Sequence, residues 1–293
     1  MKNEHGANIF ELSERLGVSQ ERLIDFSSNI NPFGASEKAK KEVIKNIDMV
    51  SIYPDPNYKK LKKAIAGYVQ VKEENIILGS GATELISSYI KILNPKKALL
   101  LSPAYSEYEK ELTKIGCEIE KLYYSKEKNF KIEVEEIVEK PFDLIVICNP
   151  NNPTGTAFTK IEIEDILKKI SGNLMIDETY IEFTEEKKYS SVSLTESYNN
   201  IFVIRGTSKF FSTPGIRLGY GILGESKLKE DLSNLSNLWN INIFATFMGE
   251  VMFEDKEYID FVKKNMKKNI LELYNSLKKI KEIKVYETSS NFI

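Results

Sequence analysis

The chain has 293 residues, of which 42% are hydrophobic and 29% are charged, and its formal net charge is -2. This composition is typical of a soluble globular protein, and the length predicts one large domain and a smaller one. The balanced charge gives no reason to expect a nucleic acid as partner, and no apolar run approaches the ~20 residues of a membrane span. The two cysteines form no CxxC pair or Cys/His cluster, so we expect a reduced, cytoplasmic protein without a metal site.

The first 47 residues predict two short helices, separated by a turn-rich segment at residues 29–34. An Asn8…Glu11 capping box predicts the start of one of these helices.

Short apolar runs then alternate with amphipathic segments of helical period. The predicted strands are Ile76–Leu78, Ala98–Leu101, Asp143–Ile147, Leu174–Ile176, Ile201–Ile204 and Leu218–Leu223. A Thr159…Glu162 capping box opens one of the helices between them. The alternation predicts an α/β fold whose mostly parallel sheet is covered by helices on both faces. Such sheets bind ligands at the carboxyl ends of their strands.

From about Glu225 the sequence predicts helices, with a long Lys/Glu-rich helical segment at Lys256–Lys281 and a strand at Ile283–Val285. We expect a large domain at residues 48–230. Residues 1–47 and 231–293 then form a small domain from both chain ends.

Unusual residues follow four of the predicted strands. The turn Gly79–Glu84 precedes a helix, and a small-residue turn at a helix N-terminus suits a phosphate, although it can also serve tight packing alone. The segment Cys148–Gly155 contains two prolines and three asparagines, more than a plain turn needs. Asp177 ends another strand, where a carboxylate needs a partner or caps the next turn. Lys209 lies five residues after the predicted strand Ile201–Ile204, although a single lysine in this lysine-rich chain is not informative alone.

Arg217 lies eight residues after Lys209, in a chain with only four arginines. It stands between a Pro-Gly turn and a glycine-rich strand. The fixed fork of a guanidinium in this place suggests recognition of an anion.

Taken together, these residues resemble the fold-type I aminotransferase superfamily, which uses pyridoxal 5′-phosphate. The resemblance rests on the segment Asn152–Gly155, on Asp177 with Tyr180, and on Ser208-Lys209 with Arg217, in this order. It covers the chain from near residue 5 to its end.

The resemblance implies a role for each of these side chains. Lys209 would bind the cofactor as a Schiff base and then act as the proton-transfer base, while Asp177 would pair with the pyridinium nitrogen. Asn152 and Tyr180 would hydrogen-bond the phenolic oxygen. The remaining implied cofactor contacts are Gly81, Ala82, Thr83, Ser208 and Arg217 at the phosphate, Tyr105 stacked on the ring, and Tyr53 at the phosphate of a neighbouring subunit. A homodimer with shared sites is thereby implied.

The first third of the chain resembles the threonine-phosphate decarboxylases of cobalamin biosynthesis, which are close relatives of the histidinol-phosphate aminotransferases. The segments that carry this likeness are residues 5–10, 25–34 and 81–86. It implies that His5, Asn29 and Asn152 line the substrate site, although His5 can equally be a solvated side chain near a terminus.

The resemblance therefore implies an enzyme that acts on an amino acid phosphate, with L-threonine O-3-phosphate decarboxylase as the first expectation. A histidinol-phosphate-type aminotransferase is the alternative. Gly206 departs from the usual hydroxyl residue at its position. Family members also continue past the point equivalent to Ile293, into a stretch that carries substrate-binding arginines. A cofactor-binding protein without turnover, with an incomplete small domain, is thus a further expectation.

Overall fold

The computed structural model describes residue 6, residues 8–235 and residues 238–293, and the chain divides into two compact units, residues 1–30 and 31–293. In the first unit, helix α1 (Ile9–Leu16) follows Asn8, whose side chain accepts a 3.3 Å hydrogen bond from the Glu11 N–H. The predicted N-cap at Asn8 is therefore confirmed, and the Asn8 side chain also donates a 2.6 Å bond to Oε2 of Glu11. A 3₁₀ turn, η1, follows at Gln20–Arg22.

The described residues of the second unit form a seven-stranded sheet in the order β1-β7-β6-β5-β4-β2-β3. Its strands are β1 (Ile76–Gly79), β2 (Lys97–Ser102), β3 (Glu118–Tyr123), β4 (Leu144–Cys148), β5 (Asn173–Asp177), β6 (Ile201–Gly206) and β7 (Gly219–Ile222). Strand β7 runs antiparallel to both of its neighbours, and the other neighbouring pairs are parallel. The carboxyl ends of β1, β4, β5 and β6 therefore share one edge with the start of β7.

The α-helices of this unit are α2 (Glu37–Lys45), α3 (Lys59–Val69), α4 (Ala82–Leu93), α5 (Glu107–Lys114), α6 (Val134–Val138), α7 (Lys160–Lys169), α8 (Glu186–Tyr189), α9 (Lys227–Leu235), α10 (Ile243–Met252) and α11 (Lys256–Leu277). Its short 3₁₀ turns are η2 (Ile47–Ser51), η3 (Glu73–Asn75), η4 (Ile181–Phe183), η5 (Val192–Glu196) and η6 (Pro214–Ile216). Among the described residues, no helix combines the length and the apolar character needed to cross a membrane.

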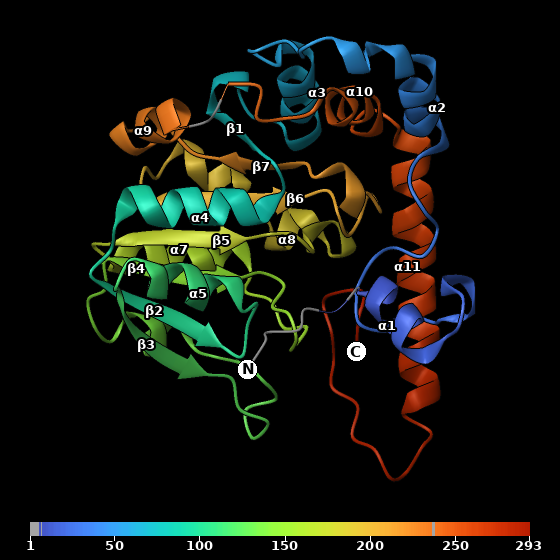
Figure 1. Cartoon of the computed structure of the whole chain (residues 1–293). Coiled ribbons are helices and arrows are strands. Elements are labelled where there is room, and N and C mark those ends of the chain that lie inside the picture. Colours follow the sequence, from blue (N-terminus) through green and yellow to red (C-terminus); the bar gives the residue numbers. More distant parts are fainter. Residues whose placement is uncertain (1–5, 7, 236–237) are drawn as a thin grey trace. The chain divides into compact units, whose positions relative to one another are not determined.

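Helices cover both faces of the sheet (Figure 1). Helices α4 and α5 pack with α9 on one face, where Tyr89, Tyr108 and Phe202 are buried. Helices α3, α7, α10 and α11 pack on the other face, around side chains such as Ile176 and Val203. The alternation of side chains along each strand thus divides the core into two layers.

The six predicted strands are confirmed, with ends that differ by one or two residues, and the Thr159 capping box is present. Strand β3 was not predicted. The predicted strand at Ile283–Val285 is wrong, because these residues have no regular secondary structure. The division into a large domain at 48–230 and a small domain from both ends remains a prediction.

Candidate active site

Asp177 ends β5 and is buried, with only 4% of its surface exposed. Its Oδ1 accepts hydrogen bonds from the N–H and the hydroxyl of Thr179, and its Oδ2 accepts a 2.7 Å bond from the hydroxyl of Tyr108 on α5. Burial raises the pKa of Asp177, whereas these hydrogen bonds and the nearby charge of Lys209 oppose the rise. The described residues donate three hydrogen bonds to this carboxylate, which can accept about four, so it can accept one more from a ligand.

The turn before α4 packs tightly against the start of β7. A Cβ added to Gly81 would lie 2.5 Å from Nη2 of Arg217, and a Cβ at Gly219 would lie 2.6 Å from the nitrogen of Ala82. Gly81 also has a φ of +88°, which disfavours other residues. The arginine and the N-terminus of α4, with the backbone of Ala82 and Thr83, thus form one cationic corner.

The backbone around Lys209 is held from two sides. Asn31 donates its N–H to the carbonyl of Lys209 at 3.0 Å, and its buried side chain donates to the carbonyl of Phe210 at 2.9 Å. On the other side, the Thr213 hydroxyl donates to the carbonyl and the hydroxyl oxygen of Thr207. The lysine is half-buried and has little freedom in its main chain.

The segment after β4 approaches the same edge. Nδ2 of Asn152 lies 3.5 Å from the hydroxyl of Tyr180, which is buried at the start of η4. Asn151 fixes this segment by donating to the carbonyl of Pro103 and to the hydroxyl of Thr154. The structure therefore brings these two predicted site residues together.

Tyr105 completes the described part of this site. Its hydroxyl lies 3.4 Å from that of Thr83, and its ring packs edge-on against Tyr108 with 5.6 Å between the ring centroids. Ser208 is half-buried beside Lys209.

Three of the predicted site residues are not among those that these contacts bring together. Tyr53 is 72% exposed and its ring stacks on Trp239. This exposure is compatible with a contact to a neighbouring subunit. His5 lies outside the described residues, and Asn29 belongs to the unit of residues 1–30.

Sequence reasoning missed Tyr108, Thr179 and Asn31 as parts of this site. Tyr108 stands in the segment that contains Tyr105, and Asn31 in the turn that contains Asn29. Only the fold shows that Tyr108 and Thr179 bind Asp177 and that Asn31 binds the Lys209 backbone. Neither composition nor a motif indicates these contacts.

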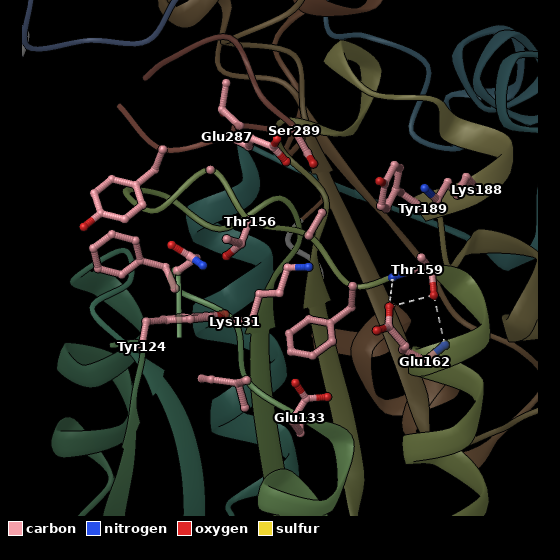
Figure 2. Close-up of a pocket in the computed structure, with 18 of the residues that line it drawn as sticks. Tyr124, Lys131, Glu133, Thr156, Thr159, Glu162, Lys188, Tyr189, Glu287 and Ser289 are labelled. Atoms are coloured by element: carbon pink, nitrogen blue, oxygen red, sulfur yellow. Dashed lines mark hydrogen bonds between the residues drawn. The ribbon is translucent and has the colours of Figure 1, made fainter. Parts of the chain in front are cut away.

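A cavity of about 820 Å³ lies between residues 155–162 and the C-terminal segment 284–289 (Figure 2). The charged side chains that line it are Lys131, Glu133, Glu162, Lys188, Lys284 and Glu287. Three lysines and three glutamates are among these residues, so the lining carries no net charge excess from them. Its lining includes none of the predicted cofactor residues, which lie at the sheet edge instead.

The model of one protein family, described as aminotransferase class I and II, matches residues 21–293. The chain belongs to the class I and II aminotransferase family.

Individual relatives agree with this family. The chain is 40% identical to a protein of Caldanaerobacter subterraneus subsp. tengcongensis named "Putative threonine-phosphate decarboxylase", over 99% of the chain and 78% of that protein. It is 30% identical to the histidinol-phosphate aminotransferase of Methanococcus aeolicus, over 97% and 77%. The crystal structure of the histidinol-phosphate aminotransferase from Clostridium acetobutylicum is 34% identical, with a TM-score of 0.82 over 92% of the chain and 81% of that structure.

Membership in this aminotransferase family makes the chain a pyridoxal-phosphate-dependent enzyme, and solved structures of the same fold contain this cofactor. The described residues fit the group. A buried carboxylate suits its ring nitrogen, the corner at Gly81 and Arg217 suits its phosphate, and a lysine stands at the same sheet edge.

Proposed function

We propose that Lys209 binds pyridoxal phosphate covalently and that the enzyme decarboxylates an amino acid phosphate, L-threonine O-3-phosphate, in cobalamin biosynthesis. The observation that carries the site is the position of Lys209 at one sheet edge with the buried Asp177, close enough for its charge to oppose the rise that burial causes in the pKa of that carboxyl. Bound pyridoxal phosphate supplies an electron sink for the bond that breaks at the substrate α-carbon.

The chain's own residues hold the ring and move the proton. Asp177 would hold a proton on the ring nitrogen of the bound cofactor, and Tyr108 and Thr179 keep its carboxylate in place. The amine of Lys209 would accept or donate the proton at the substrate carbon. Asn152 and Tyr180, which lie 3.5 Å apart, would bind the phenolic oxygen.

The cationic corner at the start of α4 binds the cofactor phosphate. Arg217 lies against Gly81, so its guanidinium and the N–H groups of Ala82 and Thr83 can bind the same anion. Ser208 adds a hydroxyl, and Tyr105 covers one face of the ring. A Cβ added to Gly206 would lie 3.4 Å from the Cβ of Ala82, an ordinary contact, so an alanine side chain would fit at this position.

The choice of substrate rests on relatives. The 40% identical relative is named as a threonine-phosphate decarboxylase, whereas the histidinol-phosphate aminotransferase from Methanococcus aeolicus is 30% identical. The second candidate, a histidinol-phosphate-type aminotransferase, is favoured by the 34% identical solved structure. His5 and Asn29 remain predicted substrate-binding residues.

Incubation of the cofactor-loaded protein with L-threonine phosphate, with and without 2-oxoglutarate, separates these activities. We expect amine product without the oxo acid. The same incubation is repeated with histidinol phosphate as the amino donor. Glutamate formed from either amino donor, and only in the presence of 2-oxoglutarate, would instead establish an aminotransferase. A cofactor absorbance that no amino acid changes would indicate a binding protein without turnover.

We also infer a homodimer, with Tyr53 of one copy at the phosphate of the other. An apolar exposed stretch supports it, since Ile44, Ile47, Val50 and Ile52 are all more than half exposed beside Tyr53. Light scattering at several protein concentrations tests the dimer. A monomer at all concentrations would contradict it.

A further inference from the structure

Five charged side chains meet on the sheet face opposite Asp177, of which three are buried and two, Glu186 and Lys263, are half-buried. Three are carboxylates and two are cations: Glu178, Glu182, Glu186, Arg205 and Lys263. Arg205 is 2% exposed, and its guanidinium binds Oε2 of Glu178 through Nη2 at 2.8 Å and through Nε at 3.0 Å. Two bonds from one guanidinium to one carboxylate fix its position and not only its charge.

This pair lies directly behind the proposed cofactor residues. Glu178 follows Asp177, and successive side chains of a strand point to opposite faces. Asp177 accordingly meets Tyr108 on the side of α5, while Glu178 meets Arg205 on the side of α8. Glu178 also donates its N–H to the carbonyl of Ile204 at 2.7 Å, which joins the ends of β5 and β6.

The acceptors of Glu178 are well satisfied. Its Oε1 accepts from the N–H of Ser191, and its Oε2 accepts from the hydroxyl of Ser190, which also receives a 2.8 Å bond from Arg205. These bonds hold the Glu178 carboxylate in one arrangement. Within the described residues, Oε2 of Glu182 has no hydrogen-bond partner, so the rigid part of the cluster is the pair of Glu178 and Arg205.

We propose that Glu178 and Arg205 are positioning residues for the cofactor site. They clamp the ends of β5 and β6 together and so fix the spacing of Asp177, one residue from Glu178, and Lys209, four residues after Arg205. The inference rests on the proposed function, because it assigns Asp177 and Lys209 to the cofactor. Misplacement of reacting groups by about 1 Å can reduce rates up to about 100-fold, so a clamp of this kind has a measurable effect.

A purely structural role is the competing explanation, since removing one partner of a buried pair destabilises a protein in any case. The readouts must therefore report the cofactor. We suggest titrating pyridoxal phosphate into wild type, Glu178→Gln and Arg205→Lys, and following the pH midpoint of the absorbance change of the lysine-bound cofactor. Glu186→Gln is the matched control, because Glu186 contacts Arg205 from α8 and not from a strand end.

We expect both variants to bind pyridoxal phosphate about tenfold more weakly, with a shifted pH midpoint, and Glu186→Gln to stay within about twofold of wild type. Unchanged affinity and midpoint in the variants that fold by circular dichroism would overturn the proposal. An equal loss in Glu186→Gln, or failure of both variants to fold, would overturn it too, because the cluster would then serve folding alone. If instead wild type carries no cofactor on Lys209, the proposed function fails first.

Discussion

Tyr108 on α5 and Asp177 at the end of β5 are joined by a 2.7 Å hydrogen bond, and both side chains are buried. The bond crosses from the helix layer to the sheet edge. It fixes the carboxylate that we propose for the ring nitrogen, from the side opposite to the Glu178 clamp.

Replacing this tyrosine tests the bond. Tyr108→Phe removes a donor to a charged acceptor, so we expect the free energy of unfolding to fall by about 1.5–3 kcal/mol. Pyridoxal phosphate should also bind more weakly, because Asp177 loses a hydrogen bond that favours its charged form. Urea unfolding of the apoprotein and an absorbance titration measure the two effects.

Tyr89 is the matched control, since it is a buried tyrosine on the same sheet face. Its hydroxyl has no hydrogen-bond partner within the described residues. Tyr89→Phe should therefore leave stability within about 0.5 kcal/mol of wild type or raise it slightly. An equal loss in the free energy of unfolding in both variants would show that the hydrogen bond from Tyr108 to Asp177 is not its cause.

Asn31 holds the backbone beside the lysine. In Asn31→Asp the acceptor for the Phe33 N–H is retained, but the donors to the Phe210 carbonyl and the Tyr258 hydroxyl oxygen are lost. The Phe210 carbonyl retains only a 3.3 Å bond from the Tyr258 hydroxyl, and the half-buried Tyr258 oxygen loses the Asn31 donor, so we expect a loss of about 1–3 kcal/mol in the free energy of unfolding. Asn265→Ala, which removes an exposed bond to the Phe261 carbonyl, should change stability by less than about 0.5 kcal/mol. Similar small effects for both would contradict the anchoring role.

Gly81 separates the helix N-terminus from Arg217. In Gly81→Ala the added Cβ meets the guanidinium at 2.5 Å and the residue keeps a φ of +88°, so Arg217 must move. We expect a loss of about 1 kcal/mol or more in stability and about tenfold weaker binding of pyridoxal phosphate. Gly215→Ala has open space around its Cβ and should bind the cofactor as wild type does. Normal affinity in Gly81→Ala would argue against a phosphate site at this corner.

Glu182 makes stability depend on pH. Burial raises its pKa to about 8 from 4.5, although the charge of Arg205 opposes the rise. The titratable groups that act on it or share its cluster are Arg205, Glu186, Lys263, Glu178, Tyr68 and Tyr220. The protonated form is favoured in the folded state, so its contribution is fully present below pH 4.5 and is lost as pH rises through about 8.

In wild type we therefore expect the free energy of unfolding to fall by an amount on the order of a few kcal/mol between pH 5 and 8.5. Glu182→Gln removes the titrating group and should flatten this part of the curve. Glu185→Gln, an exposed neighbour, should retain the wild-type slope. Urea unfolding at a series of pH values measures all three, and an unchanged slope in Glu182→Gln would show that another group is responsible.

The sequence predicted the sheet and most of the site because both depend on local patterns. Buried parallel strands appear as continuous apolar runs, as at Ile201–Ile204, and the residues after them stand at the ligand-binding edge. Strand β3 has no continuous apolar run, because charged residues are mixed with apolar ones in it; it lies at the edge of the sheet, where its side chains are partly buried or exposed. In the segment Ile283–Val285 a lysine stands between two apolar residues, and the segment pairs with none of the described strands.

Contacts between distant segments could not be predicted in this way. Tyr108 reaches Asp177 across 69 positions and Asn31 reaches Phe210 across 179. Arg205 is one of only four arginines in the chain, and nothing in its sequence neighbours indicates that it binds Glu178 behind the strand end. Such pairs follow from packing, which the pattern of one sequence does not contain.

The central claim is that Lys209 carries the cofactor, and peptide mapping tests it most directly. The protein is loaded with pyridoxal phosphate, reduced with borohydride, digested and examined by mass spectrometry, in parallel with Lys209→Ala. We predict that the cofactor-derived mass lies on the peptide that contains Lys209 and that the variant acquires no specific label. A label on a different lysine, or an equal label in Lys209→Ala, would contradict the assignment.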